Sequence, residues 1–238
     1  MSALLRVNTI YPAFMGEVNK HGIGAPCTFV RLAGCNLRCY LKTKGILCDT
    51  PEALTFKSGK EMSTSEIVNE VRDFGNKIVC LTGGEPLMQD VEELLTELSN
   101  GGFHVVIETN GSRRIEPYRH IRNVSFVVDV KSESSGESEQ MREENYSLLD
   151  EDDFLKFVID TEEDYREFCS WMVAHDYLKC KVAIGAFWGS EMSYGDIIKR
   201  TTYSFVRPIY LNMQTHKMAC LYDLHKNEAK DIFIPKDL

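Results

Sequence analysis

Short apolar segments of strand length alternate with amphipathic segments of helix length along most of this 238-residue chain. Seven segments rich in Val, Ile, Leu and Phe are predicted as strands, and they begin at Cys27, Lys77, His104, Phe126, Leu155, Lys181 and Phe205. Strands that are joined through helices run parallel in one sheet. The pattern therefore predicts an α/β fold in which six or so units form an open, partial barrel, with a ligand site at the carboxyl ends of the strands.

Three of the connecting helices are recognisable from their ends and their apolar faces. The first is predicted to begin after Ser63, with Glu66 completing a capping box, and to end at Gly75. Its apolar face is formed by Ile67, Val68, Val71 and Phe74. A second helix is predicted from about Asp90 to Asn100 and a third from about Thr161, each with apolar residues three or four positions apart.

The charge and length of the chain limit what it can bind. A net charge of −9 argues against nucleic acid and anionic membranes as partners, because both require clustered Lys and Arg, so we expect a small ligand. The sequence contains no signal-peptide pattern and no apolar run of about 18 residues, so we expect a cytoplasmic protein. One domain is expected over residues 1–238, with residues 132–153, rich in Ser, Glu and Asp, as an exposed excursion.

Three of the eight cysteines stand close together in the sequence. Cys35, Cys39 and Cys48 can present three thiolates to one metal centre from a loop that spans residues 35–48. A structural zinc site takes four ligands, whereas three thiolates on a four-iron cluster leave one iron open for a small molecule. Four further cysteines lie in or beside apolar segments and are expected to be reduced core thiols, namely Cys27, Cys80, Cys169 and Cys180.

Two polar motifs follow neighbouring predicted strands. Residues 82–86, Thr-Gly-Gly-Glu-Pro, combine glycines that allow close backbone approach with a carboxylate that can accept hydrogen bonds from an ammonium group. Residues 108–111, Glu-Thr-Asn-Gly, offer a carboxylate and an amide to a ribose or an adenine edge. Each motif alone is equally compatible with an ordinary turn, so it is their shared position after the cysteine triad that favours one common site.

The order of these motifs resembles the radical S-adenosylmethionine (SAM) superfamily. Within that superfamily, residues 15–17, 29–39 and 48–50 are similar to segments of the 7-carboxy-7-deazaguanine synthase family. Later segments agree with the same family, namely residues 128–131, 134–136, 156–159 and 214–217. The resemblance therefore extends over nearly the whole chain.

The resemblance implies a modified and shortened partial barrel that holds a [4Fe-4S] cluster on Cys35, Cys39 and Cys48, with SAM on the open iron. It implies a carbon–nitrogen lyase that converts 6-carboxytetrahydropterin to 7-carboxy-7-deazaguanine with loss of ammonia, in queuosine or other deazapurine biosynthesis. Thr50 matches a magnesium ligand of the family. A homodimer and an electron donor such as flavodoxin or ferredoxin are implied as well.

Substrate and SAM contacts are implied residue by residue. Arg31 and Glu17 are the candidate catalytic residues, because the guanidinium of Arg31 matches the position that binds the substrate carboxylate and Glu17 lies beside the pterin. The other candidate substrate contacts are Phe14, Met15, Gly16, Thr82 and His216. The candidate SAM contacts are Gly83, Gly84, Glu85, Glu108, Asn110, Asp129, Val130, Lys131, Gly185, Phe187 and Trp188.

Three features depart from the family pattern. Eight residues separate Cys39 from Cys48 instead of two, and we expect this longer loop to alter the cover over the cluster. Met15 stands where the family commonly has Gln, which leaves that pterin contact to backbone groups. The chain also continues for 21 residues beyond Lys217 to Leu238, so no contact from a terminal carboxylate is transferred.

Other interpretations stay open at this stage. Arg31 also suits a structural ion pair, His216 an ordinary core or surface histidine, and Phe187 and Trp188 ordinary packing. A different radical SAM enzyme, such as a glycyl-radical activase, would share the cluster and SAM motifs. A non-enzymatic zinc-binding protein would need a fourth ligand in addition to the three cysteines.

Overall fold

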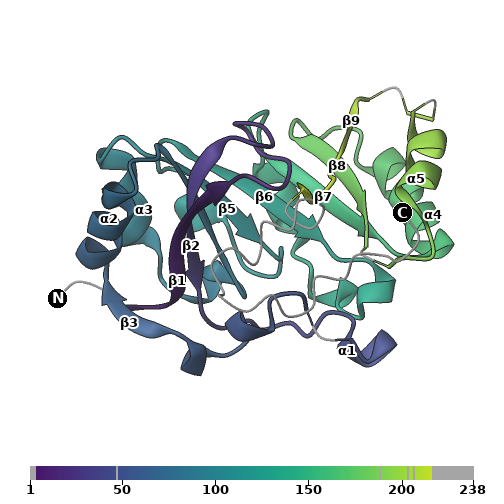
Figure 1. Ribbon diagram of the computed structural model, residues 1–238. Helices are drawn as coiled ribbons and strands as arrows, with labels where there is room; N and C mark the ends of the chain where they lie inside the picture. The colour runs from purple at the N-terminus through teal and green to yellow at the C-terminus, as the bar shows by residue number, and fades with distance from the viewer. Residues whose placement is uncertain (1–3, 47, 188, 203, 206, 216–238) are drawn as a thin grey trace.

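The computed structural model describes residues 4–46, 48–187, 189–202, 204–205 and 207–215, and in these residues nine strands form one sheet (Figure 1). The candidate site residues Trp188 and His216 lie outside the described residues. The strand order is β3-β1-β2-β4-β5-β6-β7-β8-β9. The strands are β1 Leu4–Phe14, β2 Pro26–Leu32, β3 Lys60–Ser63, β4 Ile78–Gly83, β5 His104–Thr109, β6 Val124–Val130, β7 Phe154–Ile159, β8 Lys181–Ala186 and β9 Ile209–Leu211.

Seven neighbouring strands, from β2 through β9, are parallel, which confirms the predicted open α/β sheet. β1 and β3 extend it with antiparallel pairings that the helix-strand alternation did not predict. An antiparallel strand needs no crossover helix, and β1 contains Pro12 and the polar pair Asn8 and Thr9, so its pattern is weak. β9 begins at Ile209, four residues later than the predicted Phe205.

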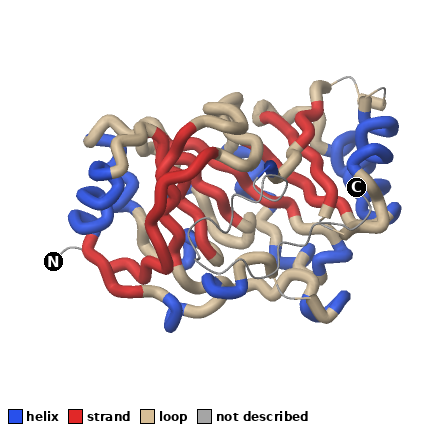
Figure 2. The backbone as a smooth tube through the Cα atoms, viewed as in Figure 1, coloured by secondary structure: helices blue, strands red, loops and turns tan. Residues whose placement is uncertain are grey.

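The longer helices lie outside the curved sheet (Figure 2). They are α2 Thr64–Asp73, α3 Glu92–Asn100, α4 Glu162–Ala174 and α5 Tyr194–Thr201. Figure 1 places α2 and α3 at one end of the sheet and α4 and α5 at the other. The predicted capping box of Ser63 and Glu66 is present. Phe74, which the sequence placed on the apolar face of the helix, is its C-cap residue and is 38% exposed. The sequence pattern also missed α5.

Short helical turns fill many of the connections. One is α1, Leu41–Lys44, in the loop between the second and third cysteines of the triad. The 3-10 turns are Pro51–Ala53, Phe56–Ser58, Pro86–Met88, Glu116–Tyr118, Glu133–Ser135, Ser138–Gln140 and Glu143–Leu148. Among the residues described, no helix is long and apolar enough to cross a bilayer.

Residues 132–153 are more ordered than an exposed excursion. The segment contains three of the 3-10 turns, and Asn145, Tyr146 and Asp153 within it are buried. The Asn145 side-chain amide donates to the backbone oxygen of Arg113 at 2.7 Å, and the Tyr146 ring packs edge-on against Trp171. The composition of the segment did not predict these buried contacts, because only a few of its residues make them.

Two apolar layers lie on opposite faces of the sheet. The larger layer packs between the convex face and the helices and includes Ile67, Leu94, Leu98, Phe126, Leu155, Phe168 and Ile184. The smaller layer lines the concave face and consists of Met15, Val18, Cys27, Cys80, Val106, Val127, Phe154 and Ala183. The concave face is where a partial barrel encloses its ligand.

Candidate active site

The concave face carries a row of polar side chains just beyond its apolar layer. Successive side chains of a strand point to opposite faces, so a residue two positions after a concave-face residue faces the same side. Two positions after Cys80, Val106, Val127 and Phe154 come Thr82, Glu108, Asp129 and Lys156. Arg31 lies four positions after Cys27 and is paired in register with Thr82. Neighbouring parallel strands therefore present polar groups at their carboxyl ends, above an apolar floor.

Two of these groups, Asp129 and Lys156, belong to a network of buried charges. The Lys156 ammonium group contacts the Glu17 carboxylate and lies 2.8 Å from Asp129 Oδ1. Lys131 Nζ lies 2.5 Å from the other oxygen of Asp129, and the Gln214 amide donates to Glu17 Oε1 at 2.7 Å. The structure thus brings together Glu17, Asp129 and Lys131, which the sequence predicted, with Lys156 and Gln214, which it did not.

The network balances two cations against two carboxylates. Burial raises the pKa of Glu17 and Asp129, but the ammonium groups of Lys156 and Lys131 outweigh it and hold both values below the ordinary range. Glu108 is a third carboxyl in the same region, and burial together with the charge of Glu17 raises its pKa to about 7. A third negative charge has no matching cation, so Glu108 holds its proton near neutral pH.

Arg31 is 8% exposed and is held by two partners from the first part of the chain. Its Nη1 lies 3.1 Å from Glu52 Oε1, and its Nη2 donates to the Tyr11 hydroxyl at 3.2 Å. The structural ion pair that the sequence left open is therefore present. Thr82 lies beside Arg31 and hydrogen-bonds Glu108, so the row is continuous from β2 to β5.

Thr50 lies two residues before Glu52, in the turn that carries the partner of Arg31. Its hydroxyl donates to Asp49 Oδ1 at 3.4 Å, so one hydroxyl and one carboxylate oxygen stand together there. Oxygen groups of this kind are the ligands that magnesium prefers, although it usually keeps several waters.

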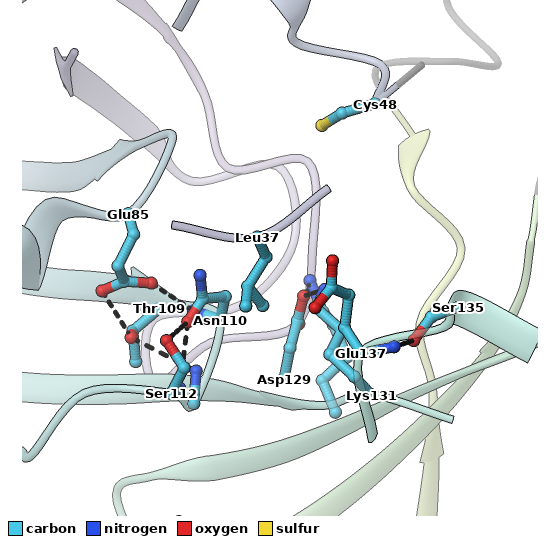
Figure 3. Close-up of polar contacts among 12 residues, drawn as sticks. Leu37, Cys48, Glu85, Thr109, Asn110, Ser112, Asp129, Lys131, Ser135 and Glu137 are labelled. Atoms are coloured by element: carbon cyan, nitrogen blue, oxygen red, sulfur yellow. Dashed lines mark hydrogen bonds and ion pairs between the residues drawn. The ribbon is translucent and has the colours of Figure 1, made fainter. Parts of the chain in front are cut away.

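The three triad cysteines lie on the loop that follows β2, and each is partly exposed. Burial raises the pKa of all three thiols, to about 12 for Cys48, and the ammonium group of Lys131 acts in the opposite direction on each. Among the described residues, no three His, Cys, Asp or Glu side chains converge closely enough to hold a metal ion. Figure 3 shows the Cys48 side chain set apart from the residues around Asn110 and Lys131.

The long segment between Cys39 and Cys48 is docked on the rim of the sheet. Lys44 of α1 places its Nζ 2.5 Å from a carboxylate oxygen of Asp160, which is fully buried after β7. The Tyr40 ring lies 4.2 Å from the Phe187 ring, centroid to centroid, just after β8. The Tyr40 backbone N–H also donates to the Ser135 oxygen at 2.7 Å. The added residues thus tie the cysteine loop to the ends of β7 and β8.

The residues after β4 secure the base of the cysteine loop. A Cβ on Gly84 would lie 2.4 Å from the Gly34 oxygen and 2.6 Å from the Ala53 oxygen, so only glycine allows this close approach. The Glu85 backbone N–H donates to the Gly34 oxygen at 2.8 Å. Gly83, next to Gly84, packs against the backbone of Leu32 in the same way.

The Glu85 side chain points into the protein rather than toward the polar row. It is fully buried, and its carboxylate accepts hydrogen bonds from Thr109 Oγ1 at 2.8 Å, the Asn110 N–H at 2.6 Å and the Leu87 N–H at 3.0 Å (Figure 3). Burial raises its pKa to about 7, and the three donors act in the opposite direction. Its observed contacts join the ends of β4 and β5, and a bond to a ligand ammonium would compete with them.

The segment after β1 crosses the concave face. Met15 is fully buried in the apolar layer of the concave face. The Gly16 oxygen accepts from the Thr215 N–H at 2.9 Å, so this segment contacts the chain that follows β9. Phe14 is 56% exposed and pairs with Pro26 at the start of β2, whereas Arg31 lies near the end of that strand. The structure does not bring Phe14 to the polar row.

Three further candidate SAM contacts lie at strand ends. The Val130 side chain packs with the larger apolar layer on the convex side, so only its backbone faces the rim. Gly185 is buried, and a Cβ there would lie 2.5 Å from the Asn212 oxygen, so it allows β8 to pack closely against the chain after β9. Phe187 donates its N–H to the Ile159 oxygen at 2.7 Å and packs on Tyr40.

The sequence reasoning missed several residues of the site. Lys156 had a usable signal, because it is the single charge in the apolar segment Phe154–Ile159 and falls on the concave-face positions. Gln214 lies in the segment 214–217 that resembles the family but was not singled out there. Tyr11 and Glu52 had no signal, because each gains its role only from its contact with Arg31.

Comparisons with known proteins find relatives of this chain by sequence and by fold. The sequence profile of the radical SAM superfamily matches residues 30–147. A 7-carboxy-7-deazaguanine synthase of Koribacter versatilis is 40% identical over 171 residues, which cover 69% of this chain and 70% of that protein. The enzyme of the same name from Leptospira interrogans is 32% identical over 228 residues, covering 89% and 93%. The crystal structure of QueE from Escherichia coli matches with a TM-score of 0.67 and 18% identity, over 88% of this chain and 93% of that one.

Proposed function

Because this chain belongs to the 7-carboxy-7-deazaguanine synthase family of radical SAM enzymes, we propose that it converts 6-carboxytetrahydropterin to 7-carboxy-7-deazaguanine. The reaction cleaves a carbon–nitrogen bond, contracts the ring and releases ammonia, as a step of queuosine biosynthesis. Enzymes of this superfamily work with a [4Fe-4S] cluster and SAM. The names of the relatives favour this activity over a glycyl-radical activase and over a zinc-binding protein.

The observation that carries the proposal is the polar row at the carboxyl ends of the parallel strands. Arg31, Thr82, Glu108, Asp129 and Lys156 face one concavity above an apolar floor. A flat heterocycle with a carboxylate fits such a surface, because the floor suits its faces and the row offers donors and acceptors to its edge.

Cys35, Cys39 and Cys48 fit the cluster by the chemistry of their donors. Three thiols share one partly exposed loop, and two N–H donors, from Leu37 at 3.5 Å and from Asn110 at 3.7 Å, already point at Cys35 Sγ. Hydrogen bonds of this kind accompany thiolate ligands. When bound, the cluster and SAM would supply the 5′-deoxyadenosyl radical that takes a hydrogen atom from the substrate.

Arg31 is the proposed clamp for the substrate carboxylate. Its guanidinium can form two charge-assisted bonds with a carboxylate in one plane. The Glu52 carboxylate contacts Nη1 of the Arg31 guanidinium. We propose that the substrate carboxylate binds the guanidinium in the same way, in place of Glu52. Glu17, fixed by Lys156 and Gln214, would accept from the pterin N–H groups.

Glu108 is the proposed source of a proton for the departing nitrogen. With a pKa of about 7, the carboxyl is largely protonated at mildly acidic pH and about half protonated at neutral pH, and its bond to Thr82 fixes its position in the polar row. The amino group of the substrate must gain a proton before its carbon–nitrogen bond breaks and ammonia departs. A proton held at a Glu108 carboxyl oxygen could be donated at this step.

The proposed contacts with SAM and magnesium lie at the carboxyl ends of the strands. We propose that the end of β6, with Asp129, the Val130 backbone and Lys131, holds SAM together with the backbone of Gly83, Gly84 and Glu85 and the Gly185 and Phe187 turn. Thr50 is proposed as the protein ligand of a magnesium ion that also contacts substrate oxygens. We further propose a homodimer and reduction by a small electron-transfer protein such as flavodoxin or ferredoxin.

An anaerobic turnover assay tests the proposal. The protein with its cluster reconstituted is mixed with 6-carboxytetrahydropterin, SAM, magnesium and a reductant, and the products are separated by liquid chromatography with mass detection. We expect 7-carboxy-7-deazaguanine and one ammonia per product. SAM cleavage to 5′-deoxyadenosine with an unchanged pterin would contradict the proposal and favour another radical SAM reaction.

A further inference from the structure

The side-chain amide of Asn110 has a fixed orientation at the carboxyl end of β5. Its Oδ1 accepts hydrogen bonds from the Ser112 N–H at 2.9 Å and from the Ser112 hydroxyl at 2.7 Å. A backbone N–H can only donate, so the atom that faces Ser112 must be the amide oxygen. The Asn110 NH₂ group therefore points the other way, toward the cysteine loop.

Asn110, Ser112 and Asn36 form a closed ring of hydrogen bonds. Asn110 Nδ2 donates to Asn36 Oδ1 at 3.4 Å, Asn36 Nδ2 donates to Ser112 Oγ at 2.9 Å, and Ser112 Oγ donates back to Asn110 Oδ1. Each bond runs in the same direction round the ring, and bonds arranged in this way strengthen one another. The ring uses one of the two amide hydrogens of Asn110.

The second amide hydrogen of Asn110 is directed at a cysteine. Asn110 Nδ2 lies 3.7 Å from Cys35 Sγ, and the Leu37 backbone N–H lies 3.5 Å from the same sulfur. Asn110 is 8% exposed, so water competes little for this contact. Both polar atoms of the amide are thus engaged within the protein.

We propose that Asn110 sets the reduction potential of the cluster by donating an N–H···S hydrogen bond to Cys35, and that Ser112 is the positioning residue that aims it. The inference rests on the proposed function only in taking Cys35 as a cluster ligand. A reduced cluster carries one more negative charge, so a donor to a ligand sulfur stabilises the reduced form and raises the potential. The Leu37 N–H acts on the same sulfur but cannot be removed by a side-chain substitution.

A redox titration monitored by electron paramagnetic resonance tests the proposal without SAM or pterin. Asn110→Leu keeps the shape of the side chain and removes the donor. We expect it to lower the reduction equilibrium constant by threefold to tenfold, and a tenfold change is about 59 mV for one electron. Asn69→Asp, on the exposed face of α2, adds a distant negative charge and should leave the potential unchanged.

A spectroscopic readout separates the hydrogen bond from a general loosening of the loop. The wild-type cluster should show couplings to two exchangeable protons that disappear in D₂O, and Asn110→Leu should lose one of them while keeping that of the Leu37 N–H. Ser112→Ala leaves Asn110 in place but opens the ring, and it should lower the potential by a smaller amount. An unchanged potential and unchanged proton couplings in cluster-loaded Asn110→Leu would overturn the proposal.

Two further outcomes are also decisive. If Asn110→Leu fails to assemble a full cluster, the potential of Ser112→Ala decides, since a lowered value supports the proposal and a wild-type value overturns it. The result is independent of turnover. A wild-type protein that makes the deazaguanine while both variants keep its potential would overturn this inference and leave the proposed function in place.

Discussion

The ammonium group of Lys156 on β7 contacts the carboxylate of Glu17, which lies 139 residues earlier in the segment after β1. This ion pair joins the segment that crosses the concave face to the middle of the parallel sheet. Asp129 shares the same ammonium group at 2.8 Å, so one cation serves two buried carboxylates. The polar row is therefore fixed in place by its charges as well as by the strands.

Replacing Lys156 tests how far the protein depends on this cation. Lys156→Met leaves Glu17 buried beside Asp129 without its cation, and an uncompensated buried charge costs about 3–5 kcal/mol of unfolding free energy. Urea denaturation followed by circular dichroism measures the loss. Lys20→Met is the matched control, because its pair with Asp152 is well exposed and should contribute less than about 1 kcal/mol. Equal losses in both variants would show that the buried network contributes no more than a surface pair.

Glu108 predicts a specific dependence of stability on pH. Its pKa is raised from 4.5 to about 7, so the folded state holds this proton more tightly than the unfolded chain. Its contribution is thus fully present below about pH 4.5 and is lost as the pH rises to about 7. Glu108→Gln cannot ionise, so we expect the variant to gain stability relative to the wild type between pH 5 and pH 8.

The measurement for Glu108 is a series of urea denaturation curves across that pH range. Glu85 has a similar raised pKa and remains in the variant, so only part of the decline with pH should disappear. Glu17 and Asp129 have lowered pKa values, so their contributions are lost below the ordinary carboxyl range and do not affect this window. Glu139→Gln, at an exposed position, should keep the wild-type slope. If the unfolding free energy of Glu108→Gln declines with pH as steeply as that of the wild type, the raised pKa belongs to a different group.

The strands that form the site were predictable because each is a short apolar run between turn residues. Glu17 and Asp129 were predicted through the resemblance, but their partner Lys156 was not, since pattern alone does not show which distant residues meet. The same limit applies to Glu85, for which a ligand contact was expected. Its carboxylate bonds with Thr109 and with the Asn110 N–H exist only once the ends of β4 and β5 lie together in the folded sheet.

The long cysteine loop gives a third prediction. Asp160 is fully buried and pairs with Lys44 at 2.5 Å, so Lys44→Met should cost about 3 kcal/mol of unfolding free energy by leaving the carboxylate uncompensated. The double variant Lys44→Met with Asp160→Asn removes the charge as well and should recover most of the loss. Lys42→Met, on the same short helix, is the control. Thermal melts that coincide for the Lys44 and Lys42 variants would show that the loop is not held by this pair.

The fourth prediction concerns the cluster ligands. In the proposed site each thiolate would supply one of three protein bonds to the cluster, so Cys48→Ala should lose iron and sulfide and abolish SAM cleavage, despite its distance from Cys39 in the sequence. Iron analysis after anaerobic reconstitution measures this, with about four irons expected per wild-type chain. Cys169→Ala, on α4, should keep its full content. Full iron and turnover in Cys48→Ala would mean that a different residue is the third ligand.

The last prediction concerns Arg31, whose guanidinium is held by Glu52 and by the Tyr11 hydroxyl. Arg31→Lys keeps the charge but loses the planar pair of donors. It should lower kcat/KM for the pterin by an amount equivalent to about 2–4 kcal/mol of activation free energy, the range for breaking a buried charge pair. Tyr11→Phe removes the neutral hydroxyl that accepts a hydrogen bond from the guanidinium and should cost about 1 kcal/mol of the same activation free energy.

Product distribution separates a substrate clamp from a structural role for Arg31. SAM cleavage that is uncoupled from the pterin needs no carboxylate clamp, so 5′-deoxyadenosine formation and cluster content should persist in Arg31→Lys while deazaguanine formation falls. Parallel quantification of both products after single turnover gives the ratio directly. A variant that converts the pterin at the wild-type rate would show that the role of Arg31 is structural, and the substrate carboxylate would then bind elsewhere along the row.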